Sequence, residues 1–142
     1  MAGGISQNQL DALFTAALEA GVALIEKSGF FLPLLFELRS SGEIQAVAML
    51  DKEASDEQDE ELARLARVLA TRASQGLIQA VAIAVNRPAD FAIELRMRAP
   101  DYAANILAPY RIETSGLMKR KRRLVLDSFA GEPARNEIFG DG

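Results

Sequence analysis

The sequence has neither histidine nor cysteine among its 142 residues. Histidine is the commonest general acid or base at neutral pH and a frequent metal ligand, while cysteine supplies thiol nucleophiles, zinc ligands and disulfides. Their absence excludes the familiar catalytic triads, zinc sites and disulfide frameworks. The lack of cysteine is also typical of a reducing compartment. We therefore expect a cytoplasmic, non-enzymatic protein that carries no metal and no other cofactor.

Motifs for phosphate, calcium or membrane binding are missing as well. Gly3 and Gly4 precede a helical segment, but no strand comes before them, so the nucleotide-binding loops are excluded. The largely acidic segment 56–61 lacks the glycine and the ligand spacing of a calcium-binding loop. The apolar stretch 10–25 is interrupted by two acidic residues, which argues against a signal peptide or a membrane span.

The overall composition is that of an ordinary globular domain. Hydrophobic residues make up 49% of the chain and charged residues 25%, close to the average for folded domains. A chain of this length buries roughly 70% of its surface on folding, which is enough for a core of its own. We expect a single domain over residues 1–142, with loose ends at about 1–5 and 130–142, where small residues, proline and charges are frequent.

The charge is unevenly distributed along the chain, whose net charge is −4. One run of five consecutive basic residues consists of Lys119, Arg120, Lys121, Arg122 and Arg123. The remaining 11 bases face 20 acids, which leaves −9 on the rest of the chain. The run could bind phosphates of a nucleic acid, but no aromatic residues are interleaved with it and the acidic remainder repels a polyanion. Docking of the run on the acidic segment 51–61, in the same chain or in a second one, is the alternative.

Two segments have the periodicity of amphipathic helices. Ser6 and Gln9 have the spacing of a capping box, apolar residues then recur every three or four positions from 10 to 25, and Gly29 suits the end of the helix. Ser55 and Gln58 repeat that capping signal before a second stripe of apolar residues at 62–73, which ends before Gly76.

The other segments read as strands separated by turns. The expected strands are 34–39, 43–50, 77–85, 91–98, 103–112 and 124–129. The strand 77–85 is apolar on both faces, which is typical of the middle of a sheet. The order is therefore α-β-β-α-β-β-β-β, and we predict an α+β two-layer sandwich in which both helices pack on one face of a mostly antiparallel sheet. This element order is similar to that of roadblock and profilin-like domains, a likeness that implies a fold class and no particular function.

A short internal similarity links two of the expected strands. Residues 42–49 and 76–83, which are 34 positions apart, are identical at six of eight positions. Either two central strands have similar requirements, or an ancient duplication has left its trace.

Two sets of polar residues are candidates for a binding surface. Glu94, Arg96 and Arg98 alternate with the apolar residues of one strand and so face away from them. A second set mixes aromatic and hydrogen-bonding groups: Tyr102, Asn105, Tyr110 and Arg111. The first set suits a surface for a protein partner, or pairs of opposite charges in water. The second suits a small-ligand cleft, or the edge of the core with tyrosine hydroxyls in water.

These patterns favour a function in binding. Two helices on one face of the sheet leave the other face uncovered, yet the strands 34–38 and 77–85 are apolar on both faces. An exposed apolar face usually marks an interface. We therefore expect a protein-interaction module that forms a homodimer, through that face or through an edge strand, and that also binds another protein. The alternatives are a small-ligand-binding or sensory domain and nucleic-acid binding through residues 119–123.

Overall fold

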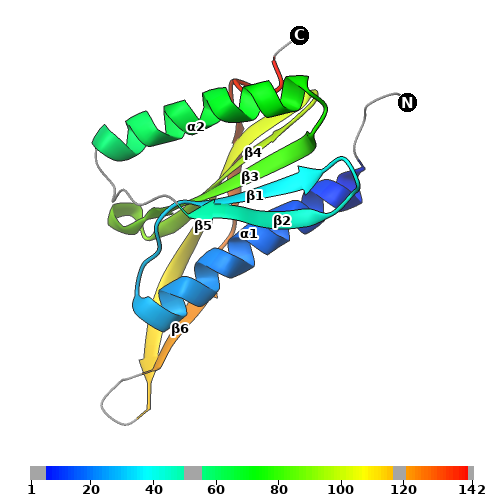
Figure 1. Ribbon diagram of the computed structural model, residues 1–142. Helices are drawn as coiled ribbons and strands as arrows, with labels where there is room; N and C mark the ends of the chain where they lie inside the picture. Colours follow the sequence, from blue (N-terminus) through cyan, green and yellow to red (C-terminus); the bar gives the residue numbers. More distant parts are fainter. Residues whose placement is uncertain (1–5, 50–55, 117–120, 141–142) are drawn as a thin grey trace.

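Two helices lie on either side of an antiparallel sheet in the computed structural model, which describes residues 6–49, 56–116 and 121–140 (Figure 1). The elements are α1 (Gln7–Ser28), β1 (Leu34–Arg39), β2 (Ile44–Met49), α2 (Asp56–Ser74), β3 (Ile78–Arg87), a 3₁₀ turn (Pro88–Asp90), β4 (Ala92–Ala99), β5 (Tyr102–Ser115), β6 (Lys121–Leu126) and β7 (Ala130–Pro133). The predicted α+β class, the antiparallel sheet and the order of helices and strands are confirmed.

Helix α1 begins and ends at the residues that the sequence indicates. The Ser6 hydroxyl accepts a hydrogen bond from the Gln9 N–H at 3.1 Å, and the Gln9 side chain accepts one from the Ser6 N–H at 3.0 Å. At the other end Gly29 has φ of 90° and donates its N–H to the Ile25 carbonyl at 2.7 Å. A left-handed residue of this kind favours glycine and stops the helix. The capping signal expected at Ser55 lies outside the described residues.

The sheet has the strand order β2-β1-β3-β4-β5-β6, and β7 pairs with β5. Strand β5 is 14 residues long because its two halves have different neighbours. Its first half pairs with β4 on one side and with β7 on the other, and its second half pairs with β6. The β5–β6 hairpin therefore extends beyond the other strands (Figure 1).

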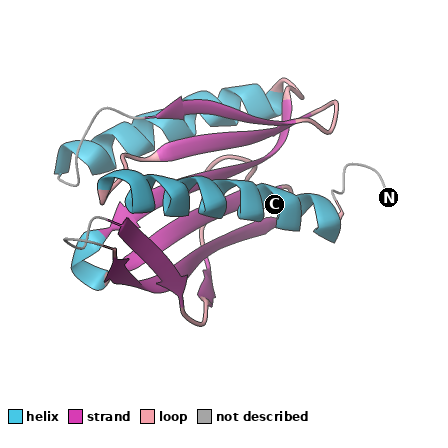
Figure 2. Ribbon diagram, turned by 90° about the horizontal axis from the view of Figure 1, so that it is seen from below, coloured by secondary structure: helices cyan, strands magenta, loops and turns pink. Residues whose placement is uncertain are grey.

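The prediction that both helices pack on one face of the sheet is wrong. Alternate residues of β3 separate into two clusters: Ala80, Ala82 and Ala84 pack with α1, whereas Val81, Ile83 and Val85 pack with α2. Successive side chains of a strand point to opposite faces, so a strand that is apolar on both faces needs cover on both. Seen from below, α1 lies in front of the strands and α2 behind them (Figure 2).

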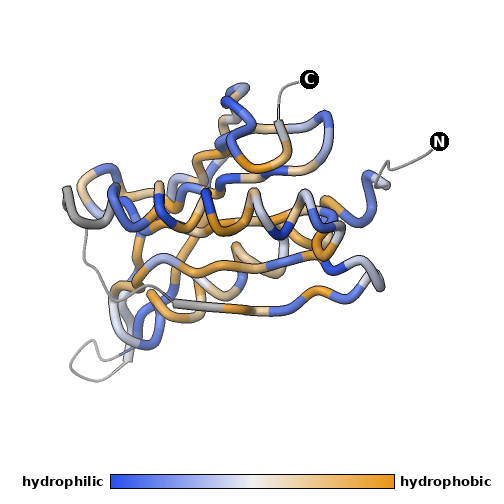
Figure 3. The backbone as a smooth tube through the Cα atoms, turned by 45° about the horizontal axis from the view of Figure 1, so that its top comes forward, coloured by the Kyte–Doolittle hydropathy of each residue, from blue (hydrophilic) through white to orange (hydrophobic). Residues whose placement is uncertain are grey.

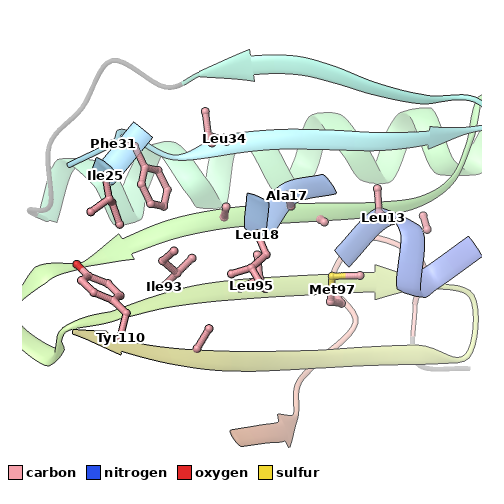
Figure 4. Packing of buried hydrophobic residues seen from close by; sticks show 14 of the residues in the cluster. Leu13, Ala17, Leu18, Ile25, Phe31, Leu34, Ile93, Leu95, Met97 and Tyr110 are labelled. Carbon is pink, nitrogen blue, oxygen red and sulfur yellow. The ribbon is translucent and has the colours of Figure 1, made fainter. Parts of the chain in front are cut away.

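The cluster on the α1 side is the larger one. Leu13, Ala17 and Leu18 of α1 pack against Leu95 and Met97 of β4 (Figure 4). The alanines of β3 on this face are small, which leaves room for the helix to lie close to the sheet. Along the tube of Figure 3 the central strands are largely hydrophobic and the connecting turns hydrophilic, as two covered faces require.

The cluster on the α2 side includes part of the C-terminal segment, which was expected to be a loose end. Residues 130–133 instead form β7, and Ile138 is only 4% exposed beside Leu62 and Leu69 of α2. The Asn136 side chain donates a hydrogen bond to the Ala99 carbonyl at 2.8 Å, which fixes this segment against the end of β4.

The two similar segments of the sequence flank the same strand. Strand β1 pairs with β2 on one side and with β3 on the other, both antiparallel. The interpretation that both segments are central strands is wrong, because β2 is the first strand in the sheet order. The chain therefore places nearly the same residues once in the middle of the sheet and once at its edge.

Candidate functional site

The predicted polar face of β4 exists and lies on the α2 side of the sheet. Glu94 accepts hydrogen bonds from Arg87 Nη2 and from Arg96 Nε, each at 2.9 Å. Burial alone would raise the pKa of Glu94, but the charge of Arg96 and the hydrogen bonds from Arg87 and Arg96 outweigh it, so this pKa is below its ordinary value. A carboxyl group of this kind stays ionised at neutral pH and suits an ion pair better than proton donation.

Arg98 is the most buried cation of this face, with a side chain 5% exposed. Its Nε lies 2.6 Å from Glu137 Oε1, and its Nη1 donates to the Met97 and Ala104 carbonyls at 2.9 and 3.1 Å. Sequence reasoning missed Glu137, because the C-terminal segment that carries it was expected to be loose. No local pattern signals a pair that is formed across 39 positions.

A hollow of about 460 Å³ lies between α2 and the polar face of β4. Arg96 and Arg98 form part of its wall, and Arg67 of α2 is a third arginine in its lining. The rest of the lining is mostly apolar and comes from α2, β3 and the C-terminal segment: Leu62, Ala63, Ala66, Ala70, Ile83 and Ile138. Glu137 is the one acid in the lining.

A second hollow, of about 560 Å³, opens between the first half of α1 and the strands β5 and β7. Phe14 and Phe129 lie in its wall with ring centroids 5.7 Å apart, and Tyr102 is 39% exposed there. Its polar lining includes the acids Asp11 and Glu132. Of the four residues predicted to form a small-ligand cleft, Tyr102 is the one that faces this hollow.

The structure does not bring the other three residues of that predicted cleft together. Tyr110 is 8% exposed, its hydroxyl is 3.5 Å from Asn86 Oδ1, and burial raises its pKa. Asn105 lies opposite Arg96 on the α2 side, and its buried Oδ1 has no hydrogen-bond partner among the described residues. Arg111 is exposed on the hairpin, 3.5 Å from Glu113. The two tyrosines are eight positions apart on one strand, and at about 3.3 Å per residue they sit at opposite ends of the core.

The described part of the basic run contributes to the fold. Lys121, Arg122 and Arg123 lie in β6, and Lys119 and Arg120 are outside the described residues. The Nη1 atom of Arg122 donates to the carbonyls of Glu26 and Lys27 at the C-terminal end of α1, both at 3.4 Å. These carbonyls have no partner within the helix, and a cation is favourable at this end of the helix dipole.

The outer edge of β2 is a further candidate. In the described part of the chain β2 pairs with β1 alone, so its other edge presents backbone N–H and C=O groups without a strand partner. Residues 44–49 include no charge and no proline, and Val47 is 43% exposed. Natural sheets usually protect an edge with charges, proline or bulges that twist it away. Within the described residues, β2 has one such bulge: Leu35 pairs with Ala48 and Phe36 with Ala46, so Val47 is an extra residue of β2.

Comparisons with models of known families, with curated proteins and with solved structures find no match for this chain. Neither described helix is both long and apolar enough to cross a membrane. The described residues also include no group of three or more acidic side chains positioned to hold a metal ion.

Proposed function

We propose that this chain is a protein-interaction module that binds a second copy of itself through the outer edge of β2. The observation that carries this proposal is the mismatch between the sequence of β2 and its position. Its residues nearly repeat those of β3, a strand with a neighbour on both sides, yet among the described strands β2 has one neighbour. Pairing with a second β2 gives the strand the environment that its sequence suits.

A symmetric antiparallel pairing uses the groups that β2 leaves unpaired. Two copies of residues 44–49 joined about a two-fold axis form one continuous sheet, and such an interface is closed because each copy presents the same edge. The uncharged sequence brings no like charges into contact along the strand. An edge of six residues buries little area, so we expect a weak dimer that forms at micromolar concentrations or above.

An uncovered sheet face does not support self-association in this molecule. The expectation of such a face depended on both helices lying on the same side, whereas α1 and α2 cover one side each. The proposal therefore rests on the edge of the sheet alone.

Nucleic-acid binding through residues 119–123 has less support. Arg122 is engaged at the end of α1, which leaves Lys121 and Arg123 as the other described cations of the run. The rest of the chain, which carries −9 outside the run, also repels a polyanion.

The test is sedimentation of the whole chain from low-micromolar to near-millimolar concentration. We expect the average mass of the wild type to rise toward that of a dimer, and Val47→Lys to remain monomeric because a charge in the edge opposes strand pairing. Val68→Lys is the matched control, since Val68 is 56% exposed and belongs to α2, not to β2. A wild type that stays monomeric, or a Val47→Lys variant that dimerises like the wild type, would contradict the proposal.

A further inference from the structure

The hollow beside α2 is built from small apolar residues on one wall and arginines on the other. Ala63, Ala66 and Ala70 occur at three- and four-residue spacing on α2, so they share one side of the helix. Ile83 of β3 and Ile138 of the C-terminal segment complete the apolar part. A volume of about 460 Å³ falls within the range of small-molecule sites.

The three arginines of the lining have more donors than the protein itself uses. Arg67 is exposed, and its side chain makes no hydrogen bond or ion pair within the described part of the chain. Arg96 uses its Nε for Glu94 and leaves both terminal nitrogens without a partner among the described residues. Arg98 uses Nε and Nη1, which leaves Nη2.

The charged groups at the hollow are also unbalanced, with more positive than negative ones. Three guanidinium groups line the hollow together with one carboxylate, that of Glu137, which Arg98 holds at 2.6 Å. Glu94, outside the lining, pairs with Arg96, so the three cations are matched by two carboxylates. The hollow is thus positive although the whole chain carries −4. A guanidinium group binds a carboxylate or a phosphate through two parallel hydrogen bonds, and it binds more strongly where apolar walls exclude water.

We propose that this hollow binds a small organic anion, with a carboxylate or phosphate head against Arg67 and Arg96 and an apolar body against the alanines of α2. Both parts of the ligand are needed. An uncharged apolar molecule cannot form ion pairs with the arginines, and an inorganic ion makes no favourable contact with the apolar wall. This site lies on the face of the sheet and not at the edge of β2, so it is independent of the proposed dimer.

The test is calorimetric titration of the whole chain with hexanoate and with phenyl phosphate. Two partial ligands serve for comparison: benzyl alcohol, which has an apolar body without an anionic head, and inorganic phosphate, which is an anion without an apolar body. We expect one equivalent of hexanoate or of phenyl phosphate to bind, and the better of the two identifies the head group. Each partial ligand should bind at least about tenfold more weakly, since each lacks one of the two interactions. Equal binding of inorganic phosphate and phenyl phosphate would overturn the proposal, as would the absence of binding by both organic anions.

Two kinds of variant locate the site. Arg67→Gln and Arg96→Gln should each weaken binding about tenfold, the effect of losing one charge-assisted pair. Arg64→Gln is the matched control, because Arg64 lies on the same helix but pairs with Glu61 and is absent from the lining. Ala66→Phe fills the hollow without changing its charge and should abolish binding. Unchanged affinity in both Arg67→Gln and Ala66→Phe, with circular dichroism like that of the wild type, would place the anion elsewhere and refute the site.

Discussion

Arg72 holds the carboxylate of Glu37 by two hydrogen bonds, with Nε 3.0 Å from Oε2 and Nη2 2.9 Å from Oε1. Glu37 lies in the middle of β1 and its side chain is 1% exposed, whereas Arg72 lies in the last turn of α2. The pair therefore ties the end of α2 to the sheet. Arg39 supplies a third hydrogen bond to the same carboxylate at 3.1 Å.

We expect Arg72→Ala to lower the free energy of unfolding by about 3 kcal/mol, because it leaves a buried carboxylate with one cation in place of two. Arg64→Ala, which breaks the exposed pair with Glu61, should cost no more than about 0.5 kcal/mol. Urea denaturation of both variants measures the difference. A double-mutant cycle with Glu37→Leu should show strong coupling to Arg72, and additive effects of the two substitutions would contradict the interaction.

Gly21 marks a close approach of α1 to Phe31. A Cβ atom at this position would lie 3.0 Å from the ring of Phe31 and 3.5 Å from Cδ1 of Ile93. Alanine is the better helix former, by about 1 kcal/mol, but Phe31 is buried and has little room to move. We expect Gly21→Ala to destabilise the fold by about 1 kcal/mol or more, as overpacking does. Thermal unfolding measures the loss, and Phe31→Leu in the same chain should recover part of it. If Gly21→Ala alone raises the melting temperature, the contact is looser than described.

Arg122 stabilises the end of α1 through the helix dipole and two carbonyls. We expect Arg122→Ala to lower the unfolding free energy by about 0.5 kcal/mol at low ionic strength, and by less at high salt, because an exposed charge is screened. Arg123→Ala, which removes a neighbouring cation with no described contact to α1, is the control. Denaturation at two salt concentrations separates this role from packing, since a packing loss does not depend on salt.

The lowered pKa of Glu94 makes stability depend on pH in a definite direction. A carboxyl group whose pKa is lower in the folded than in the unfolded chain stabilises the fold above its unfolded pKa, and this contribution is lost as the pH falls through the folded pKa. We therefore expect Glu94→Gln to be less stable than the wild type at neutral pH and to approach it in acid. Urea denaturation from neutral pH to about pH 3 follows both proteins. A difference that is constant over this range would show that Glu94 acts through shape alone.

Most of the secondary structure could be predicted because its signals are local. The capping box at Ser6 and Gln9 and the glycine at 29 define α1 within a few neighbouring residues. The alternation of apolar and polar residues in β4 identifies the strand and the face that carries Arg96 and Arg98. Each of these patterns depends on backbone geometry that repeats every two or four residues.

The arrangement of the elements was harder to predict because it depends on distant contacts. The alternation in β3 shows that both faces are covered, but it does not say which helix covers which face. The site beside α2 was missed for the same reason: Arg67, Arg96 and Glu137 come from three separate parts of the chain. The predicted cleft of tyrosines failed because Tyr102 and Tyr110 are eight residues apart on one extended strand, so that only Tyr102 lines the hollow beside α1.

The division of β3 between two clusters has a consequence for how the molecule can vary. Ala82 belongs to the interior under α1, and the next residue along the chain, Ile83, belongs to the interior under α2. A substitution at either residue therefore changes the packing of one cluster only, while the backbone of β3 between the two clusters stays in place. The hollow beside α2 is lined by Ile83 but not by Ala80, Ala82 or Ala84 of β3. Its binding specificity can therefore change without any repacking of the larger cluster under α1.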